Sequence, residues 1–112
     1  IIFLYFGETI VMEIVKPGIE YRLHNFKSET EYQTVRFTEK TAVGFNPGTT
    51  NEEVVSMLID RLYALQNKNF SVENQCCIIL LKQVRVLLKK RLNRKIDRVN
   101  KYQENAAGDQ NK

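Results

Sequence analysis

Arg91 and Lys95, two cations four residues apart, are the residues of this sequence whose type and spacing best suit binding chemistry. They lie between Lys82 and Lys101, a stretch with nine Lys or Arg residues and one acid, Asp97, in a chain whose net charge is +4. The basicity is therefore local, and a local cationic surface favours an anionic partner. Residues four apart share one face of a helix, so these two cations would suit a diphosphate or a phosphodiester.

Three interpretations of the basic stretch are open. The cations can form the solvated outer face of a long helix, with Asp97 pairing locally with Arg94 or Lys101. They can bind duplex nucleic acid through charge alone, since no interleaved aromatic residues or known nucleic-acid motif accompany them. They can also converge near a subunit contact, because Arg91 and Lys95 lie beside an apolar seam of the same helix.

The sequence suggests no catalytic site. It has one histidine, no Cys/His spacing typical of a metal site and no glycine-rich phosphate loop before a helix. We expect His24 to be a strand residue, since general acid–base catalysis needs partners that the sequence does not suggest. Cys76 and Cys77 lie in an apolar helical run, and we expect free thiols that act as small core residues in a reducing, cytoplasmic compartment. A binding protein without metal or cofactor is therefore expected, not an enzyme.

The N-terminal half must supply a small sheet. Residues 12–48 are expected to form an antiparallel β region with strands at 12–15, 20–26, 32–38 and 41–45. Residues 1–11 are either upstream sequence, with Met12 as the true start, or an extra strand, which their β-branched and aromatic composition suits. They are too short to cross a bilayer as a helix, so no membrane partner is expected.

Residues 49–104 are expected to form a helical hairpin. The capping box Thr50-Asn51-Glu52-Glu53 predicts a helix that ends near Gln66. Ser71 is a good N-cap for a second helix that continues without Gly or Pro to about residue 104. The expected fold class is α+β, with one domain overall and a disordered tail at residues 105–112.

The second helix is expected to be about twice as long as the first, roughly 50 Å against roughly 25 Å. Its apolar residues keep helical spacing throughout: Cys77, Leu81, Val84, Leu88, Leu92, Ile96, Val99 and Tyr102. The first helix is too short to cover the distal half of this series. We therefore expect another subunit to cover it, which predicts a homo-oligomer.

Between residues 46 and 95 the sequence carries an ordered series of short motifs: Asn51-Glu52, Asp60-Arg61-Leu62, Gln66, Phe70, Glu73-Asn74, Leu87-Leu88 and Lys90-Arg91. In this order they resemble the phage anti-Thoeris sponge family, whose helical hairpin is shared with anti-CBASS sponges. The resemblance implies a non-enzymatic anti-defence protein that assembles as a symmetric homo-oligomer in the cytoplasm of the infected bacterial host. It also implies binding and sequestration of cyclic ADP-ribose isomers made by TIR-domain immune proteins, which blocks Thoeris immunity without cleaving the ligand.

By this resemblance, Asn74 would hydrogen-bond ribose or base, while Arg91 and Lys95 would contact the diphosphate. Leu65 stands where relatives often carry an aromatic residue, and Lys95 where an Arg is expected, which would weaken base stacking and bidentate phosphate contact. Arg94 completes the expected ligand-binding set. Asn74 and Arg91 are separated by ~25 Å along one helix, so an antiparallel pairing of helices from two chains would be needed to bring them together.

Simpler roles exist for the same residues. Asn74 can be an ordinary first-turn residue beside the Ser71 cap, and Arg91 can be a surface cation. A small phage nucleic-acid-binding protein that uses the basic helix is the alternative function, and nucleic acid is an expected partner only in that case. A purely structural oligomer is the third possibility.

Overall fold

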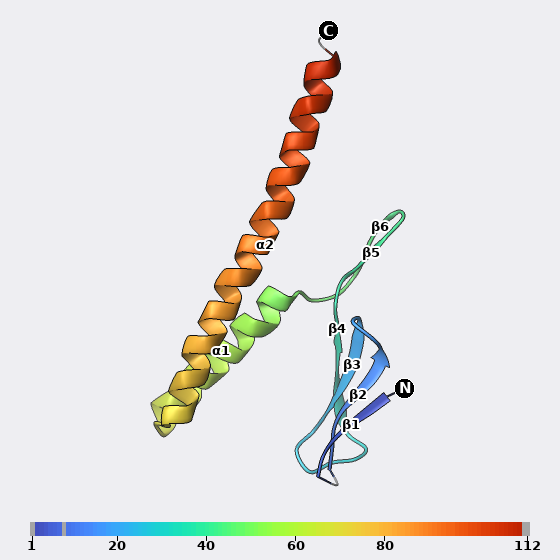
Figure 1. Ribbon diagram of the computed structural model, residues 1–112. Helices are drawn as coiled ribbons and strands as arrows, with labels where there is room; N and C mark the ends of the chain where they lie inside the picture. Colours follow the sequence, from blue (N-terminus) through green and yellow to red (C-terminus); the bar gives the residue numbers. More distant parts are fainter. Residues whose placement is uncertain (1, 8, 111–112) are drawn as a thin grey trace. The chain divides into compact units, whose positions relative to one another are not determined.

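The structure of the chain is a computed structural model that describes residues 2–7 and 9–110 (Figure 1). An antiparallel sheet is followed by a helical hairpin with a long second helix, which confirms the predicted α+β class. The chain divides into two compact units, Ile1–Asn51 and Glu52–Lys112, where the sequence predicted one domain. The division falls where the strand pattern gives way to helical periodicity. No helix within the described ranges is both long and apolar enough to span a membrane.

The first unit is built on a four-stranded antiparallel sheet, in which each strand pairs with the next along the chain. Its strands are β1 (Ile2–Phe6), β2 (Thr9–Lys16), β3 (Glu20–His24) and β4 (Tyr32–Arg36). Of the two alternatives for residues 1–11, the structure has the extra strand, with residues 1 and 8 outside the described part. Because β2 begins at Thr9, Met12 lies inside a strand and opposite Leu23 of β3.

A second, two-stranded sheet follows, made of β5 (Glu39–Thr41) and β6 (Gly44–Asn46). The sequence predicted one strand over 41–45, and the structure instead has a turn there. Gly44 explains the difference, because its φ of +145° lies in a region that side-chain-bearing residues rarely adopt. Gly48 closes the base of this hairpin, where a Cβ atom would overlap the backbone of Phe37.

The second unit consists of α1 (Asn51–Lys68) and α2 (Val72–Gln110). Each helix begins directly after its predicted capping residue, Thr50 or Ser71. At the start of α2, the Ser71 hydroxyl accepts a hydrogen bond from the Asn74 amide, 3.2 Å away. The Gln66 side chain brackets the backbone of Ser71: its Nε2 donates to the carbonyl at 2.9 Å, and its Oε1 accepts from the amide at 2.8 Å. The turn between the helices is therefore fixed at both ends.

The predicted disordered tail at 105–112 is wrong for residues 105–110, which continue α2. Ala106 and Ala107 are strong helix formers and no proline interrupts the segment, so the helix extends beyond Tyr102, its last large apolar residue. Residues 111–112 lie outside the described part. At 1.5 Å per residue, the 39 residues of α2 span about 58 Å and the 18 residues of α1 about 27 Å.

The apolar core of the chain is small. Ile59 of α1 and Ile78 of α2 are the only apolar residues, among those whose burial the structure describes, that are fully buried. Cys76 and Cys77 are exposed, so their predicted place in a core is wrong, because successive helical residues turn by about 100° away from the buried Ile78. The accessible surface of the chain is 9442 Å². Two compact units, each with half the mass of the chain, would together expose only about 7,700 Å².

Candidate functional site

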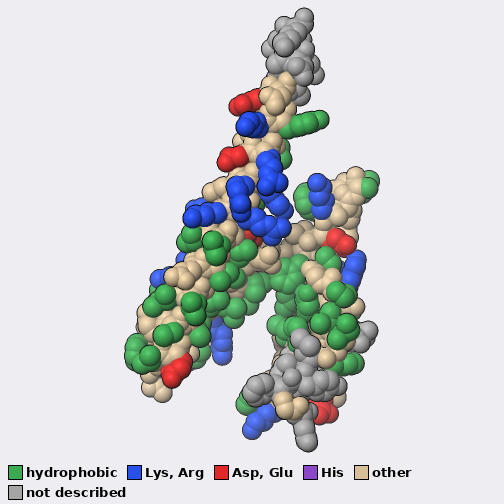
Figure 2. Space-filling model, viewed as in Figure 1, with side chains coloured by type: hydrophobic (Ala, Val, Ile, Leu, Met, Phe, Trp, Pro, Cys, Tyr) green, Lys and Arg blue, Asp and Glu red, His purple; other side chains and the backbone are tan. Residues whose placement is uncertain are grey.

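Three predicted ligand residues, Arg91, Arg94 and Lys95, lie together on the distal half of α2. All three side chains are exposed, and helical geometry places them within about 100° of arc. None of them forms an ion pair or hydrogen bond within residues 2–7 and 9–110. Figure 2 shows the Lys and Arg side chains gathered along this part of α2. The three cations are therefore available to an anionic ligand.

Asn74 occupies the first turn of α2, as its simpler interpretation predicted, but its side chain does not cap the helix. Ser71 is the cap, and Asn74 contributes only its backbone amide to that bond. The half-buried Asn74 carboxamide has no hydrogen-bond partner among the residues that the structure describes. Two donors and an acceptor oxygen are thus free at the start of α2.

Glu73 adds a negative charge next to Asn74. Its own backbone hydrogen bond and the Ser71 hydroxyl, whose Oγ lies 3.0 Å from the carboxylate, hold the pKa of Glu73 below its ordinary value of 4.5. The side chain is fully exposed and ionised at neutral pH. The start of α2 therefore presents a neutral amide beside a carboxylate, while Arg91 presents a cation seventeen residues later.

Leu65 lies near the end of α1 and is half-buried, and its carbonyl accepts a hydrogen bond from the Asn69 amide at 2.9 Å. Sequence reasoning missed Tyr63, a residue that is 41% exposed and whose ring centroid lies 5.0 Å from the Lys82 ammonium of α2. A cation over an aromatic ring links the two helices and leaves part of the ring open to solvent. The sequence feature that could have pointed to Tyr63 is its position beside the apolar stripe of α1, which it broadens.

One chain does not bring the whole predicted set together. Leu65 and Asn74 lie near the turn between the helices, whereas Arg91, Arg94 and Lys95 lie ~25 Å or more along α2. No single small ligand can contact both groups in one copy. The site is therefore complete only if a second copy supplies one half of it.

An exposed apolar surface lies on α2 between these two groups. Leu80 is 60% exposed, Val84 41% and Leu87 64%, while Leu81 and Leu88, which the sequence placed in the seam, are half-buried. A shallow depression joins this surface to the cations, and it is lined by Leu87, Lys90, Asn93, Arg94 and Asp97. The apolar surface therefore continues directly into the basic part of the helix.

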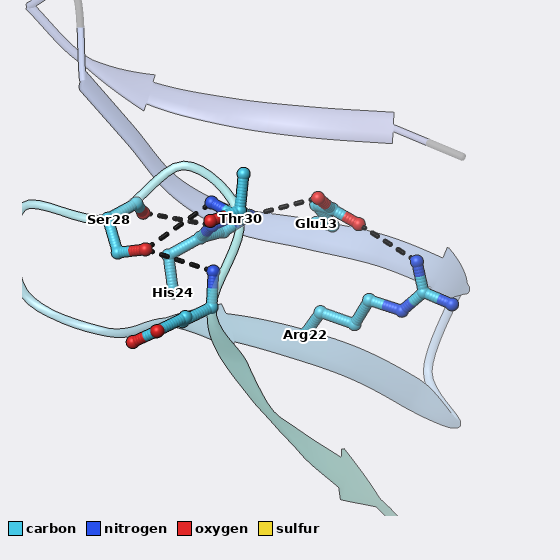
Figure 3. Close-up of polar contacts among 6 residues, drawn as sticks. Glu13, Arg22, His24, Ser28 and Thr30 are labelled. Atoms are coloured by element: carbon cyan, nitrogen blue, oxygen red, sulfur yellow. Dashed lines mark hydrogen bonds and ion pairs between the residues drawn. The ribbon is translucent and has the colours of Figure 1, made fainter.

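The polar cluster of the sheet explains the single histidine (Figure 3). His24 Nε2 lies 2.9 Å from Glu13 Oε1, His24 Nδ1 lies 3.2 Å from the Ser28 carbonyl, and Arg22 reaches Glu13 at 3.4 Å. The His24 side chain is only 3% exposed, and Glu13 is the buried charged residue of the sheet. These contacts bind the β3–β4 loop to β2, so the cluster supports the fold.

A cavity of ≈ 470 Å³ lies at the base of the β5–β6 hairpin, lined on its apolar side by Val15, Ile19, Phe37 and Pro47. Its cations are already neutralised, since Lys16 pairs with Glu39 at 3.1 Å and Arg36 pairs with Glu20. This cavity therefore suits an anion less well than the unpaired cations of α2. No cluster of three or more potential metal ligands occurs in the described part of the chain.

Comparison with protein-family models and with curated proteins gives no match to this chain. The case for its function therefore rests on the residues and geometry of α2.

Proposed function

We propose that this chain is a phage anti-defence protein that binds and sequesters a cyclic ADP-ribose isomer made by TIR-domain immune proteins, and so blocks Thoeris immunity without cleaving the ligand. The ligand is held between two copies of the chain. Arg91, Lys95 and Arg94 of one copy bind the diphosphate, and Asn74 of the other binds ribose or base. The setting is the cytoplasm of the infected bacterial host.

The observation that carries this proposal is the set of unpaired polar groups on α2. Arg91 and Lys95 are exposed and lack acidic partners, and Asn74 has a free carboxamide, within the described residues. Guanidinium and ammonium groups bind phosphate oxygens through charge-assisted hydrogen bonds, and a carboxamide can both donate to and accept from a base. This donor set fits a ligand that combines a diphosphate with a nucleoside.

The exposed surface supports the involvement of a second copy. The chain exposes roughly 1,700 Å² more than two compact units of its mass would, and a standard interface buries about 800 Å² per partner. Apolar side chains of α2 such as Leu80 and Leu87 contribute to this exposed surface. Covering that surface with a second copy would also bring the distal cations of one helix to the start of the other.

Sequestration needs binding and nothing more. It depletes the signal when the protein is more abundant than the signal and its dissociation constant lies below that of the effector. Residues 88–98 of α2, around the candidate phosphate contacts, include no histidine or cysteine, which suits retention of the ligand without turnover.

The test is calorimetric titration with cyclic ADP-ribose isomers of wild type, Arg91→Ala and Asn74→Ala, with oligomeric state checked for each. Each substitution removes a hydrogen bond to a charged or polar ligand group, so the dissociation constant should rise about 10- to 100-fold. Lys89→Ala is the matched control, because Lys89 is also an exposed cation but lies roughly 160° around the helix from Arg91. Equal losses in Lys89→Ala and Arg91→Ala would refute the assigned site.

The same variants separate the alternative function, a small phage nucleic-acid-binding protein. Cations also occupy other faces of α2, at Lys82, Lys90 and Lys101, which would suit a polyanion surrounding the helix. Binding to duplex DNA would depend steeply on salt and would fall about equally for Arg91→Ala and Lys89→Ala. Indifference to both ligands would leave a structural oligomer.

A further inference from the structure

The cavity at the base of the β5–β6 hairpin combines an apolar wall with a charged rim, and the proposed nucleotide site does not use it. Its volume of ≈ 470 Å³ lies in the range of about 300–1,000 Å³ that is usual for small-molecule sites. The rim carries two cations and two carboxylates: Lys16, Arg36, Glu20 and Glu39. These four charges sum to zero, so the rim favours a ligand without net charge.

Hydrogen bonds between backbone groups fix the walls of this cavity. The turn at the end of β2 is closed by the Ile19 amide, which donates to the Lys16 carbonyl at 2.9 Å. Gly18 supplies the φ of +78° that this turn requires, and its amide donates to the Tyr21 hydroxyl at 2.8 Å. The Phe37 amide donates to the Ile19 carbonyl at 2.7 Å and so joins two sides of the apolar wall. A ligand therefore has little of this wall to order when it binds.

The ion pair between Arg36 and Glu20 uses only part of the hydrogen-bonding capacity of its two side chains. Arg36 donates from both Nε and Nη2 to the same oxygen, Glu20 Oε1. Within the described residues, neither Glu20 Oε2 nor Arg36 Nη1 has a partner. A guanidinium carries five N–H groups, and a carboxylate accepts at both oxygens. The pair therefore offers a ligand one cationic donor and one anionic acceptor while it stays intact.

We propose that this cavity binds a zwitterionic α-amino acid with an apolar side chain. The α-carboxylate accepts hydrogen bonds from Arg36, and the α-ammonium donates to the free oxygen of Glu20. The apolar side chain of the ligand lies against the half-buried residues of the wall, Val15, Ile19 and Phe37. All these residues belong to the first unit, so the site is independent of the function proposed for α2.

Ligands with other charges fit this rim less well. An organic acid would bring its charge close to Glu20 and Glu39, and an organic amine would bring its charge close to Arg36 and Lys16. Like charges in proximity oppose binding. An uncharged ligand would leave the free groups of the Arg36–Glu20 pair without charged partners. A zwitterion meets both groups with the opposite charge, which makes it the class that the rim selects.

The test is an NMR titration of the full chain with L-phenylalanine or L-leucine up to about 10 mM. Two matched probes each lack one charge of phenylalanine: 2-phenylethylamine has no carboxylate, and 3-phenylpropionate has no ammonium. Phenylalanine should give saturable shifts of the Ile19 and Phe37 amide signals, and each matched probe should bind at least about tenfold more weakly. Equal binding of either probe and phenylalanine, or no saturable shift with either amino acid, would overturn the proposal.

Two variants test the contacts separately. Glu20→Gln keeps the shape of the side chain but removes its charge, so the dissociation constant for phenylalanine should rise about tenfold. Glu29→Gln is the matched control, because Glu29 is an exposed glutamate that does not line the cavity. Ile19→Ala should weaken phenylalanine binding about fivefold through lost apolar contact. Equal dissociation constants for Glu20→Gln and Glu29→Gln would overturn the ammonium contact, and shifts confined to the signals of α2 would overturn the placement of the site.

Discussion

Glu13→Gln is expected to destabilise the sheet while leaving the helices unchanged. Glu13 is 8% exposed, and its two carboxylate oxygens lie 2.9 Å from His24 Nε2 and 3.4 Å from an Arg22 nitrogen. Glutamine has nearly the same shape but no charge, and only one of its two terminal side-chain atoms is an oxygen. The substitution therefore replaces the carboxylate contacts to His24 and Arg22 with contacts to a neutral carboxamide, and at least one charge-assisted contact is lost.

The size of the effect follows from the burial of each partner. A hydrogen bond to a charged group contributes about 1.5–3 kcal/mol, and the His24 side chain, 3% exposed, should approach the upper part of that range. The Arg22 side chain is 33% exposed, so solvent screens its ion pair and its share is small. A loss of about 2 kcal/mol is expected, which would lower the urea midpoint of the sheet by about 2 M if its m-value is ~1 kcal/mol/M.

The assay is a urea titration followed by NMR amide signals, read separately for β3 and for α1. Glu29→Gln is the matched control, because Glu29 is an exposed glutamate of the β3–β4 loop. The reasoning would be refuted if Glu13→Gln changed the free energy of unfolding of the sheet by less than about 0.5 kcal/mol, the usual effect of a surface substitution. An equal loss in the α1 signals would refute the assignment of the effect to the sheet.

Further predictions concern the helical unit. Ser71→Ala removes the cap of α2 and should cost about 1 kcal/mol in urea titration, whereas an unchanged midpoint would show that the hydroxyl does not cap. Gln66→Ala removes both bonds to the Ser71 backbone and a third, of 3.3 Å, to the Gln75 side chain, and should cost about 1–2 kcal/mol by the same measurement, unless water replaces them fully. The pKa of Glu73 is lowered from 4.5, so the stability that its carboxylate contributes is present above that pH and is lost as the pH falls through the lower folded value. Carbon NMR should show this pKa rising in Ser71→Ala, and an unchanged pKa would contradict the assigned cause. Leu87→Ala should weaken self-association about 30- to 100-fold in sedimentation equilibrium, since Leu87 is 64% exposed on the surface that the proposed second copy covers and each substitution counts twice in a symmetric pair.

The helical hairpin was largely predictable because its signals are local. Capping residues directly precede both helices, at Thr50 and Ser71, and the apolar periodicity that follows is long enough to be unambiguous. The fold class followed from the same contrast with the alternating residues before Thr50. Helix ends were less well predicted: α1 continues two residues beyond Gln66, and α2 continues to Gln110.

The features that sequence could not supply depend on which face of an element packs. Leu80 and Leu81 both fit an apolar series along α2, and only the buried position of Ile78 decides that Leu80 is the exposed one. The same ambiguity put Cys77 in a core. The turn at Gly44 was missed because the short segment 41–45 has the composition of a strand, while the backbone angle that breaks it has no local signal beyond the glycine itself.

The residue types of the candidate site could be predicted from the sequence, but their arrangement in space could not. The charge count singled out the stretch between Lys82 and Lys101, and spacing together with the family resemblance pointed to Arg91 and Lys95 within it. The structure shows these two residues and Arg94 exposed and unpaired within its described residues. The free carboxamide of Asn74 could not be inferred from sequence, since a first-turn asparagine often caps its own helix. Tyr63 was overlooked because its exposure depends on how α1 packs against α2.

The central claim is that the chain holds a cyclic, diphosphate-containing nucleotide without consuming it. The most direct measurement is calorimetric titration of the purified chain with cyclic ADP-ribose isomers, followed by denaturation and mass analysis of the released ligand. Our proposal predicts saturable binding of at least one isomer, lost in Arg91→Ala and retained in Lys89→Ala, with the ligand recovered intact. No binding of any isomer, or recovery of a cleaved product, would contradict it.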